Sequence, residues 1–112
     1  MKTDDCGAII SFIGTVRNRS NDGKPVISLQ IEPADENAEA KLGNVENEIR
    51  RKWPIQDIVI VRRIGKLKVG EIALVISVLA IHRQEAFQAC EYAVDMIKKG
   101  NITLEQDIFE NG

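Results

Sequence analysis

Two stretches near the start of the chain show the hydrophobic pattern of strands. Residues 8–16 are rich in β-branched and aromatic side chains, and residues 26–32 alternate apolar and polar side chains with a period of two. The segment between them, 18–25, is dense in turn-forming residues, and Asp22-Gly23 is its strongest reversal signal. The pattern therefore predicts two strands joined by a tight connection.

The hydrophobic pattern changes to a helical period after residue 35. Asp35 is in the position of an N-cap, and Pro54 is expected to end the helix because proline cannot continue it. Gly43 costs this helix about 1 kcal/mol relative to alanine, which does not outweigh the pattern. The apolar residues on one stripe of the predicted helix are Ala38, Leu42, Val45, Ile49 and Trp53.

The second half of the chain contains an almost unbroken apolar run followed by another helical pattern. Residues 57–64 predict a third strand, residues 65–70 a connection bounded by two glycines, and residues 72–81 a buried central strand. Residues 83–99 return to helical spacing, and Gly100 is in the position of the C-cap. The residues expected on the inner face of this helix are Ala86, Phe87, Cys90, Ala93, Val94 and Ile97.

The predicted order of elements is ββαββα. Two helices separated by pairs of strands favour an α+β domain of two layers, a sheet with helices on one face, over a doubly wound parallel sheet. The last stretch, 102–109, can add a short edge strand. Residues 1–112 are expected to form a single domain, because no repeat, low-complexity segment or linker divides them. At this size a homodimer would bury surface that one copy leaves exposed.

Composition and charge narrow the classes of function. The chain has 15 Lys and Arg against 17 Asp and Glu, a net charge of -2, which argues against a general nucleic-acid-binding protein. Cys6 and Cys90 are far apart in the sequence, so we expect no disulfide framework, no metal site and no cofactor. The N-terminus lacks a signal core, and no apolar run approaches the roughly 18 residues that span a membrane. We therefore expect a cytoplasmic protein with reduced thiols and no membrane partner.

Cationic side chains follow several of the predicted strands. His82 and Arg83 come directly after the central strand, and Arg17 follows the first strand. Arg62 and Arg63 end the third strand, and because neighbouring strand residues point to opposite faces, at most one of them can serve a pocket. Each position alone is also explained by a solvated surface side chain. Since arginine binds phosphate and carboxylate oxygens bidentately, we predict that Arg17, His82 and Arg83 lie close together in an anion pocket, to which a second protomer can contribute.

Five short motifs occur in the order and spacing of one family. They are Gly7-Ala-Ile-Ile-Ser-Phe-Ile-Gly-Thr-Val-Arg-Asn18, Arg50-Arg-Lys-Trp-Pro54, Arg63-Ile-Gly65 with Leu67, Gly70-Glu71, and His82-Arg83 with Ala86-Phe87. Over residues 4–99 the chain resembles the large, catalytic subunit of molybdopterin synthase. The resemblance implies an α/β-hammerhead fold and a homodimer that forms a heterotetramer with a small ubiquitin-like sulfur-carrier subunit. It also implies sulfurtransferase activity in molybdenum cofactor biosynthesis: two sulfurs pass from that partner's C-terminal thiocarboxylate to a cyclic pyranopterin monophosphate, which becomes molybdopterin.

The same resemblance implies roles for particular side chains. Arg17, His82, Arg83 and Lys99 would bind the anionic substrate, and Lys98 at the end of the second long helix would be the catalytic acid or base. Ring opening and sulfur addition both require proton transfer, which suits such a group. The alternative that Lys99 acts instead stays open. Without the resemblance, both lysines are explained as cations at the negative end of a helix dipole.

The resemblance departs from the family pattern after Lys98. The family continues through an Arg-Ala-Pro-Phe-Trp-Lys type segment, whereas this chain reads Lys98-Lys99-Gly100-Asn101-Ile102-Thr103-Leu104-Glu105, so Glu105 occupies the position of a second active-site lysine. Arg62 stands where a histidine is usual. Two other functions therefore stay open: a module that binds a pterin phosphate or nucleotide without turnover, and a dimeric scaffold for the ubiquitin-like partner. In a working enzyme Glu105 should face away from the pocket or pair with a cation, because an unpaired carboxylate repels anions.

Overall fold

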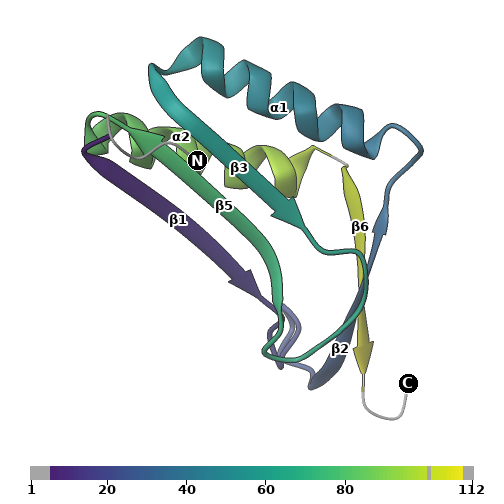
Figure 1. The fold of residues 1–112 in the computed structure, drawn as a ribbon. Coiled ribbons are helices and arrows are strands. Elements are labelled where there is room, and N and C mark those ends of the chain that lie inside the picture. Colours follow the sequence, from purple (N-terminus) through teal and green to yellow (C-terminus); the bar gives the residue numbers. More distant parts are fainter. Residues whose placement is uncertain (1–5, 101, 110–112) are drawn as a thin grey trace.

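The computed structural model describes residues 6–100 and 102–109 of the chain. These residues form two helices and two antiparallel sheets of three strands each (Figure 1). The elements in chain order are β1 (Ala8–Thr15), β2 (Val26–Pro33), α1 (Ala38–Lys52), β3 (Ile55–Arg62), β4 (Gly65–Lys68), β5 (Ile72–Ala80), α2 (Arg83–Lys99) and β6 (Thr103–Phe109). The α+β class and the edge strand after the second helix are confirmed. The division of the strands between two sheets differs from the single sheet that the pattern predicted.

The sheet β1-β5-β3 carries the larger hydrophobic core. The apolar strand β5 lies in its centre, as predicted, and pairs antiparallel with β1 on one side and β3 on the other. Alternate residues of β5 point toward the helices, and Ile76 and Val78 are completely buried there. Both helices cover the same face of this sheet (Figure 1). Burial in this core raises the pKa of the Cys90 thiol, which makes it a packing residue rather than a nucleophile.

The sheet β4-β2-β6 encloses a second, smaller core. Its central strand β2 pairs antiparallel with β4 and with β6. The buried cluster consists of Val16, Ile31, Leu67 and Ala73, with Leu29 packed against it. Val16 follows β1 and Ala73 belongs to β5, so this small core lies where the two sheets meet.

Strand β4 was not expected from the sequence, which predicted a connection over residues 65–70. The two glycines do bound the segment, and Gly65 and Gly70 have positive φ angles of 113° and 88°. Between them Leu67 enters the small core while its two lysine neighbours stay exposed. Strand β3 also begins and ends two residues earlier than the predicted 57–64. These corrections have one cause: pairing with β2 and β5, rather than local pattern, sets where these strands begin and end.

The helix α1 begins three residues after its predicted N-cap. Asn37 is the N-cap residue, and Asp35 instead organises the preceding turn. One carboxylate oxygen of Asp35 accepts a hydrogen bond from the backbone N–H of Asn37 at 2.8 Å, and the other accepts one from the Lys41 ammonium at 2.7 Å. The Lys41 hydrogen bond is the main reason that the pKa of Asp35 is lowered from its ordinary value.

The helix α2 follows its predicted boundaries, and its C-cap is Gly100 as expected. A Cβ at Gly100 would come within 2.4 Å of the Met96 carbonyl oxygen, which explains the glycine. The prediction that Phe87 faces the core is wrong, because its side chain is 57% exposed. Phe87 is one residue past the buried Ala86, and a rotation of about 100° per residue takes it off the inner face.

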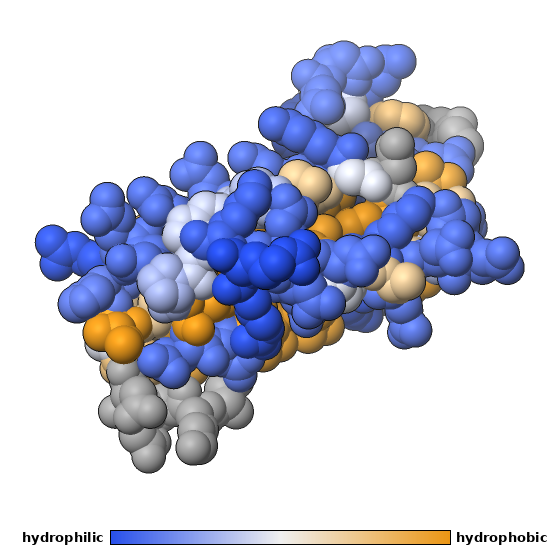
Figure 2. All heavy atoms as spheres, turned by 90° about the horizontal axis from the view of Figure 1, so that it is seen from above, coloured by the Kyte–Doolittle hydropathy of each residue, from blue (hydrophilic) through white to orange (hydrophobic). Residues whose placement is uncertain are grey.

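The outer surface over α1 is mostly hydrophilic, with apolar residues visible chiefly in the furrows between charged side chains (Figure 2). Within the described residues, no helix combines the length and the apolar character needed to cross a membrane.

Candidate functional site

The loop that follows β1 places Arg17 at the junction of the two sheets. Val16 is buried. Its backbone N–H donates a hydrogen bond to the Glu71 carbonyl at 3.0 Å, and its carbonyl accepts one from the Gly70 N–H at 2.9 Å. The start of the loop is therefore held firmly. The exposed Arg17 donates a hydrogen bond from its guanidinium to the Asn21 side chain at 3.0 Å.

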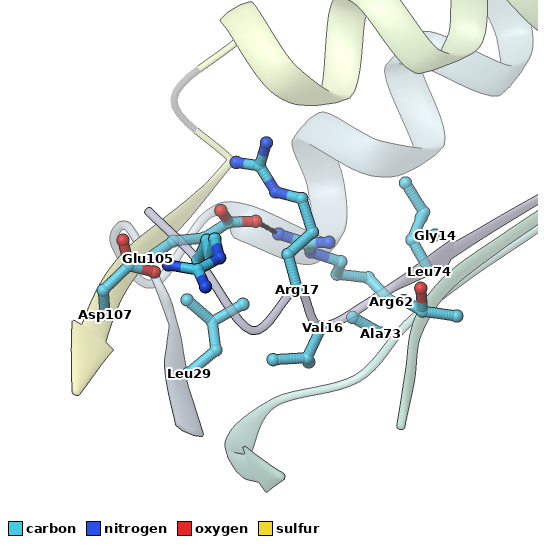
Figure 3. A pocket seen from close by; sticks show the side chains of 11 residues that line it. Gly14, Val16, Arg17, Leu29, Arg62, Ala73, Leu74, Glu105 and Asp107 are labelled. Carbon is cyan, nitrogen blue, oxygen red and sulfur yellow. Dashed lines mark hydrogen bonds and ion pairs between the residues drawn. The ribbon is translucent and has the colours of Figure 1, made fainter. Parts of the chain in front are cut away.

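A small cavity of about 80 Å³ opens beside this loop. The charged residues that line it are Arg17, Arg19, Arg62, Glu105 and Asp107. The remaining lining residues come from the ends of β1 and β5, from β2 and from the loop after β1, so five strands and one loop converge here. Figure 3 shows Arg62 and Glu105 pointing toward one another, with Arg17 beside them. A cavity of this size holds a few water molecules or one small oxyanion.

Arg62 and Glu105 form the ion pair of this cavity. One terminal nitrogen of Arg62 contacts a carboxylate oxygen of Glu105 (Figure 3). The Arg62 side chain is only 10% exposed, whereas that of Glu105 is 49% exposed. The expectation that Glu105 pairs with a cation is therefore met, although its carboxylate also faces the cavity.

Lys98 borders a second, more open pocket of about 330 Å³. The residues around this pocket are Arg62, Ile97, Lys98, Thr103, Leu104 and Glu105. Because Arg62 and Glu105 line both hollows, they separate the arginine cavity from the pocket of Lys98. Lys99 is exposed and lines neither of these two hollows.

His82 and Arg83 lie elsewhere, at the start of α2. His82 is the N-cap residue of this helix and makes no side-chain capping hydrogen bond. Both residues line a separate open pocket of about 520 Å³ with Gly7, Ile81 and their helix neighbours. Its lining has no residue in common with the cavity of Arg17.

The prediction that Arg17, His82 and Arg83 converge is wrong within one protomer. In the antiparallel pairing of β1 with β5, Ala8 is opposite Ala80 and Thr15 is opposite Ile72. The end of β5, which delivers His82, therefore lies beside the start of β1, whereas Arg17 follows its end. Over the eight residues of β1 this separation amounts to about 24 Å.

Three charged residues of the cavity were not predicted as site residues. Of the pair at the end of β3, Arg62 turns into the cavity, while Arg63 contacts the Ile72 carbonyl at 3.3 Å and Glu71 at 3.9 Å on the other side. The alternation of strand residues indicated that only one of the two could serve, but not which. No local sequence pattern marks Arg19 or Asp107 as a site residue. Asp107 reaches the site only because its strand, β6, pairs with β2.

Comparison with known proteins identifies the group to which this arrangement belongs. The model of the MoaE protein family matches residues 1–100. The molybdopterin synthase catalytic subunit of Thermoplasma volcanium is 41% identical over 112 residues, which cover 100% of this chain and 81% of the relative. The subunit of the same name from Rattus norvegicus is 38% identical over 105 residues, and the chain spans 52% of its length.

A solved structure supports the same assignment. The crystal structure of molybdopterin synthase from Staphylococcus aureus superimposes with a TM-score of 0.88 at 37% sequence identity. The match covers 97% of this chain and 79% of that one. The chain therefore belongs to the MoaE protein family, in which its relatives are molybdopterin synthase catalytic subunits.

Proposed function

We propose that this protein is the catalytic subunit of a molybdopterin synthase. In this role it transfers sulfur from the C-terminal thiocarboxylate of a small ubiquitin-like subunit to cyclic pyranopterin monophosphate, in molybdenum cofactor biosynthesis. The observation that carries the proposal is the 41% identity to a subunit of that name across all 112 residues. The cytoplasm is the expected location, because thiocarboxylate chemistry and reduced thiols suit a reducing compartment.

The charged residues at the junction of the sheets suit this chemistry. Arg17, Arg19 and Arg62 supply cations for a phosphate and for the acidic end of the partner. In each transfer a carbon of the substrate gains the sulfur, the acyl–sulfur bond breaks, and water supplies the oxygen that returns the partner's tail as a carboxylate. Lys98 borders the adjoining pocket, where its ammonium can donate a proton to an oxygen that leaves the substrate.

The proposal includes a homodimer, because one protomer alone separates the predicted site residues. A second copy would bring its His82 and Arg83 to the cavity of Arg17, so that each site draws on both chains. The face of the first sheet that is turned away from the helices supports an interface between copies. Ile9 and Ile13 of β1 and Val61 of β3 lie on this face and are 54%, 56% and 52% exposed. Two small subunits would then complete a heterotetramer.

A reconstituted reaction tests the function. The protein is mixed with a thiocarboxylated small subunit and cyclic pyranopterin monophosphate, and molybdopterin is quantified by mass spectrometry. We expect one molybdopterin for every two thiocarboxylates consumed. The absence of product with a small subunit that is active with another synthase would refute the enzyme assignment.

Glu105 favours one second candidate, a module that binds the pterin phosphate without turnover. Its carboxylate faces the cavity in which an anion would bind. The substitution Glu105→Lys separates the two functions. If the unaltered protein forms molybdopterin, the enzyme assignment stands. If only the Glu105→Lys variant forms it, the unaltered protein is a binding module.

A further inference from the structure

We propose that Asn21 is a positioning residue for Arg17, whose guanidinium it holds at the cavity through a neutral hydrogen-bond acceptor. Arg17 thereby meets an anion in one orientation and with its full positive charge. The inference deepens the proposed function, on which it rests for the identity of the anion. It concerns a residue to which the sequence pattern gave only a place in a turn.

The loop between β1 and β2 forms a closed frame that does not depend on the Asn21 side chain. The Ser20 N–H donates a hydrogen bond to the Lys24 carbonyl at 2.9 Å, and the Gly23 N–H donates one to the Ser20 carbonyl at 3.0 Å. Gly23 has a positive φ of 83°, which glycine adopts without strain at such a reversal. Asn21 lies at the tip of this frame and is exposed. Its side chain is therefore not needed to close the turn.

Both arginines of this loop that line the cavity are held by the loop itself. Arg17 donates a hydrogen bond from Nη2 to the Asn21 Oδ1 at 3.0 Å, and Arg19 donates one from Nη1 to the Gly23 carbonyl at 3.2 Å. Each contact reaches four residues along the chain, toward the tip of the loop. A guanidinium has five N–H donors, so one such contact does not exhaust the donors of either arginine.

The kind of acceptor distinguishes these two arginines from Arg62. Arg62 is paired with the Glu105 carboxylate, which offsets its positive charge (Figure 3). Asn21 and Gly23 instead offer an amide oxygen and a backbone carbonyl oxygen, neither of which carries a net charge. A carboxylate repels an anion, whereas a neutral acceptor does not. The two loop arginines can therefore attract an anion more strongly than Arg62 can.

A neutral acceptor matters because the cavity has little positive charge. Its charged lining consists of three arginines against the carboxylates of Glu105 and Asp107, an excess of one positive charge. Order matters as well, since an exposed arginine samples many rotamers that a ligand would have to restrict on binding. The Asn21 contact restricts Arg17 before the ligand arrives and costs no charge, so we expect it to tighten the binding of an anion.

Nitrogen-15 NMR of the full chain tests the positioning directly. The heteronuclear NOE of the Arg17 Nε–H, assigned with Arg17→Lys, measures how ordered this side chain is on the picosecond-to-nanosecond timescale. Asn21→Ala should lower this NOE, and Asn21→Asp should keep it, because a carboxylate also accepts the hydrogen bond. The Arg63 Nε–H, on the other side of β3, is the control and should change in neither variant. An equal Arg17 NOE with and without the Asn21 side chain overturns the proposal.

The affinity for inorganic phosphate, followed at the backbone amides of the loop, tests the consequence. We expect Asn21→Ala to weaken phosphate binding about threefold, the effect of one exposed hydrogen bond. Asn21→Asp should weaken it about tenfold although Arg17 stays ordered, because the added carboxylate repels the anion. Phosphate that moves none of these amides, or equal affinity in the three proteins, would contradict the proposal.

A double-mutant cycle separates the positioning of Arg17 from a general effect of the loop. In the Arg17→Ala protein, Asn21→Ala should cause no further loss of phosphate affinity, since no guanidinium remains to be held. In the Arg63→Ala protein, the same change should cause its full loss of about threefold. Equal losses in the two backgrounds would mean that Asn21 does not act through Arg17, and the proposal would fail.

These measurements do not depend on sulfur transfer. A protein in which Asn21 orders Arg17 and tightens phosphate binding, but which forms no molybdopterin, retains the positioning role and loses the proposed function. A protein that forms molybdopterin while its Arg17 is equally ordered without the Asn21 side chain retains the function and loses the inference.

Discussion

The two sheets of this protein differ in how much of their stability comes from a buried core. Within the described residues, the sheet β1-β5-β3 packs both helices against one face, and its cluster contains fourteen buried residues. In the same part of the chain, the sheet β4-β2-β6 encloses four buried residues and carries no helix of its own. The candidate site lies at the junction, where strands from both sheets supply charged side chains. The sheet with the larger core thus supports one wall of the site, and the sheet with the smaller core supplies Glu105 and Asp107.

The largest expected effect comes from truncating one buried side chain in each core, which tests whether the two cores contribute differently to stability. Ile76→Ala in the larger core is expected to lower the free energy of unfolding by about 4 kcal/mol, because the surrounding helices cannot close the cavity. Leu67→Ala is the matched change in the smaller core, with an expected loss of about 2 kcal/mol, since loosely packed strands can collapse onto the gap. Urea unfolding followed by circular dichroism measures both. Equal losses would show that the two cores are equally rigid.

Loss of the Lys98 ammonium should separate activity from stability. Lys98→Ala is expected to reduce the rate of sulfur transfer about a hundredfold, because general acid catalysis contributes at least that much. Its effect on the free energy of unfolding should stay below about 1 kcal/mol, the value of a cation at a helix C-terminus. Lys99→Ala, one residue further on, is the control and should retain most activity. If Lys99→Ala is inactive while Lys98→Ala is active, Lys99 rather than Lys98 is the catalytic acid.

Mixed dimers test whether the site draws on both protomers. Arg17→Ala and Arg83→Ala should each be inactive alone, since every site in such a dimer lacks one arginine. After mixing and subunit exchange, half of the dimers are hybrids with one intact site, so activity should recover to about a quarter of the unaltered protein. No recovery, together with hybrids detected by native mass spectrometry, would place Arg17 and Arg83 in separate functions.

The smallest expected effect concerns an ion pair that fastens β3 to α1. Arg50 donates a hydrogen bond to Asp57 at 2.8 Å, and this contact is the main reason that the pKa of Asp57 is lowered from its ordinary value. Because the folded pKa is the lower one, the stabilisation is complete above about pH 4 and is lost as the pH falls through the folded pKa. Since both side chains are partly exposed, it should be worth less than about 1 kcal/mol.

The variant Asp57→Asn measures this contribution. We expect its unfolding free energy to lie below that of the unaltered protein at pH 7 and to approach it as the pH falls below about 4. A difference that persists unchanged at acidic pH would mean that Asp57 stabilises β3 by packing rather than by charge.

Much of the fold follows from local patterns in the sequence. The uninterrupted apolar run predicted β5 as the central strand, and the helical spacing predicted α2 with its C-cap at Gly100. These elements were predictable because their residues bury one face or both, and burial leaves a periodic signature. β4 was not predictable, since only its pairing with β2 makes a four-residue segment between glycines a strand.

The candidate site was also predictable from the sequence only in part. Arginines at strand ends and the ordered motifs were enough to indicate an anion site and a family. Which of these side chains meet depends on strand pairing between distant parts of the chain. The antiparallel pairing of β1 with β5 places Arg17 and His82 at opposite ends of that strand pair. Neighbouring residues of β3 point to opposite faces, and it is Arg62 rather than Arg63 that enters the cavity. The pairing of β2 with β6 brings Glu105 to Arg62. The Arg62–Glu105 contact alone joins residues 43 positions apart, and no local pattern records such a distance.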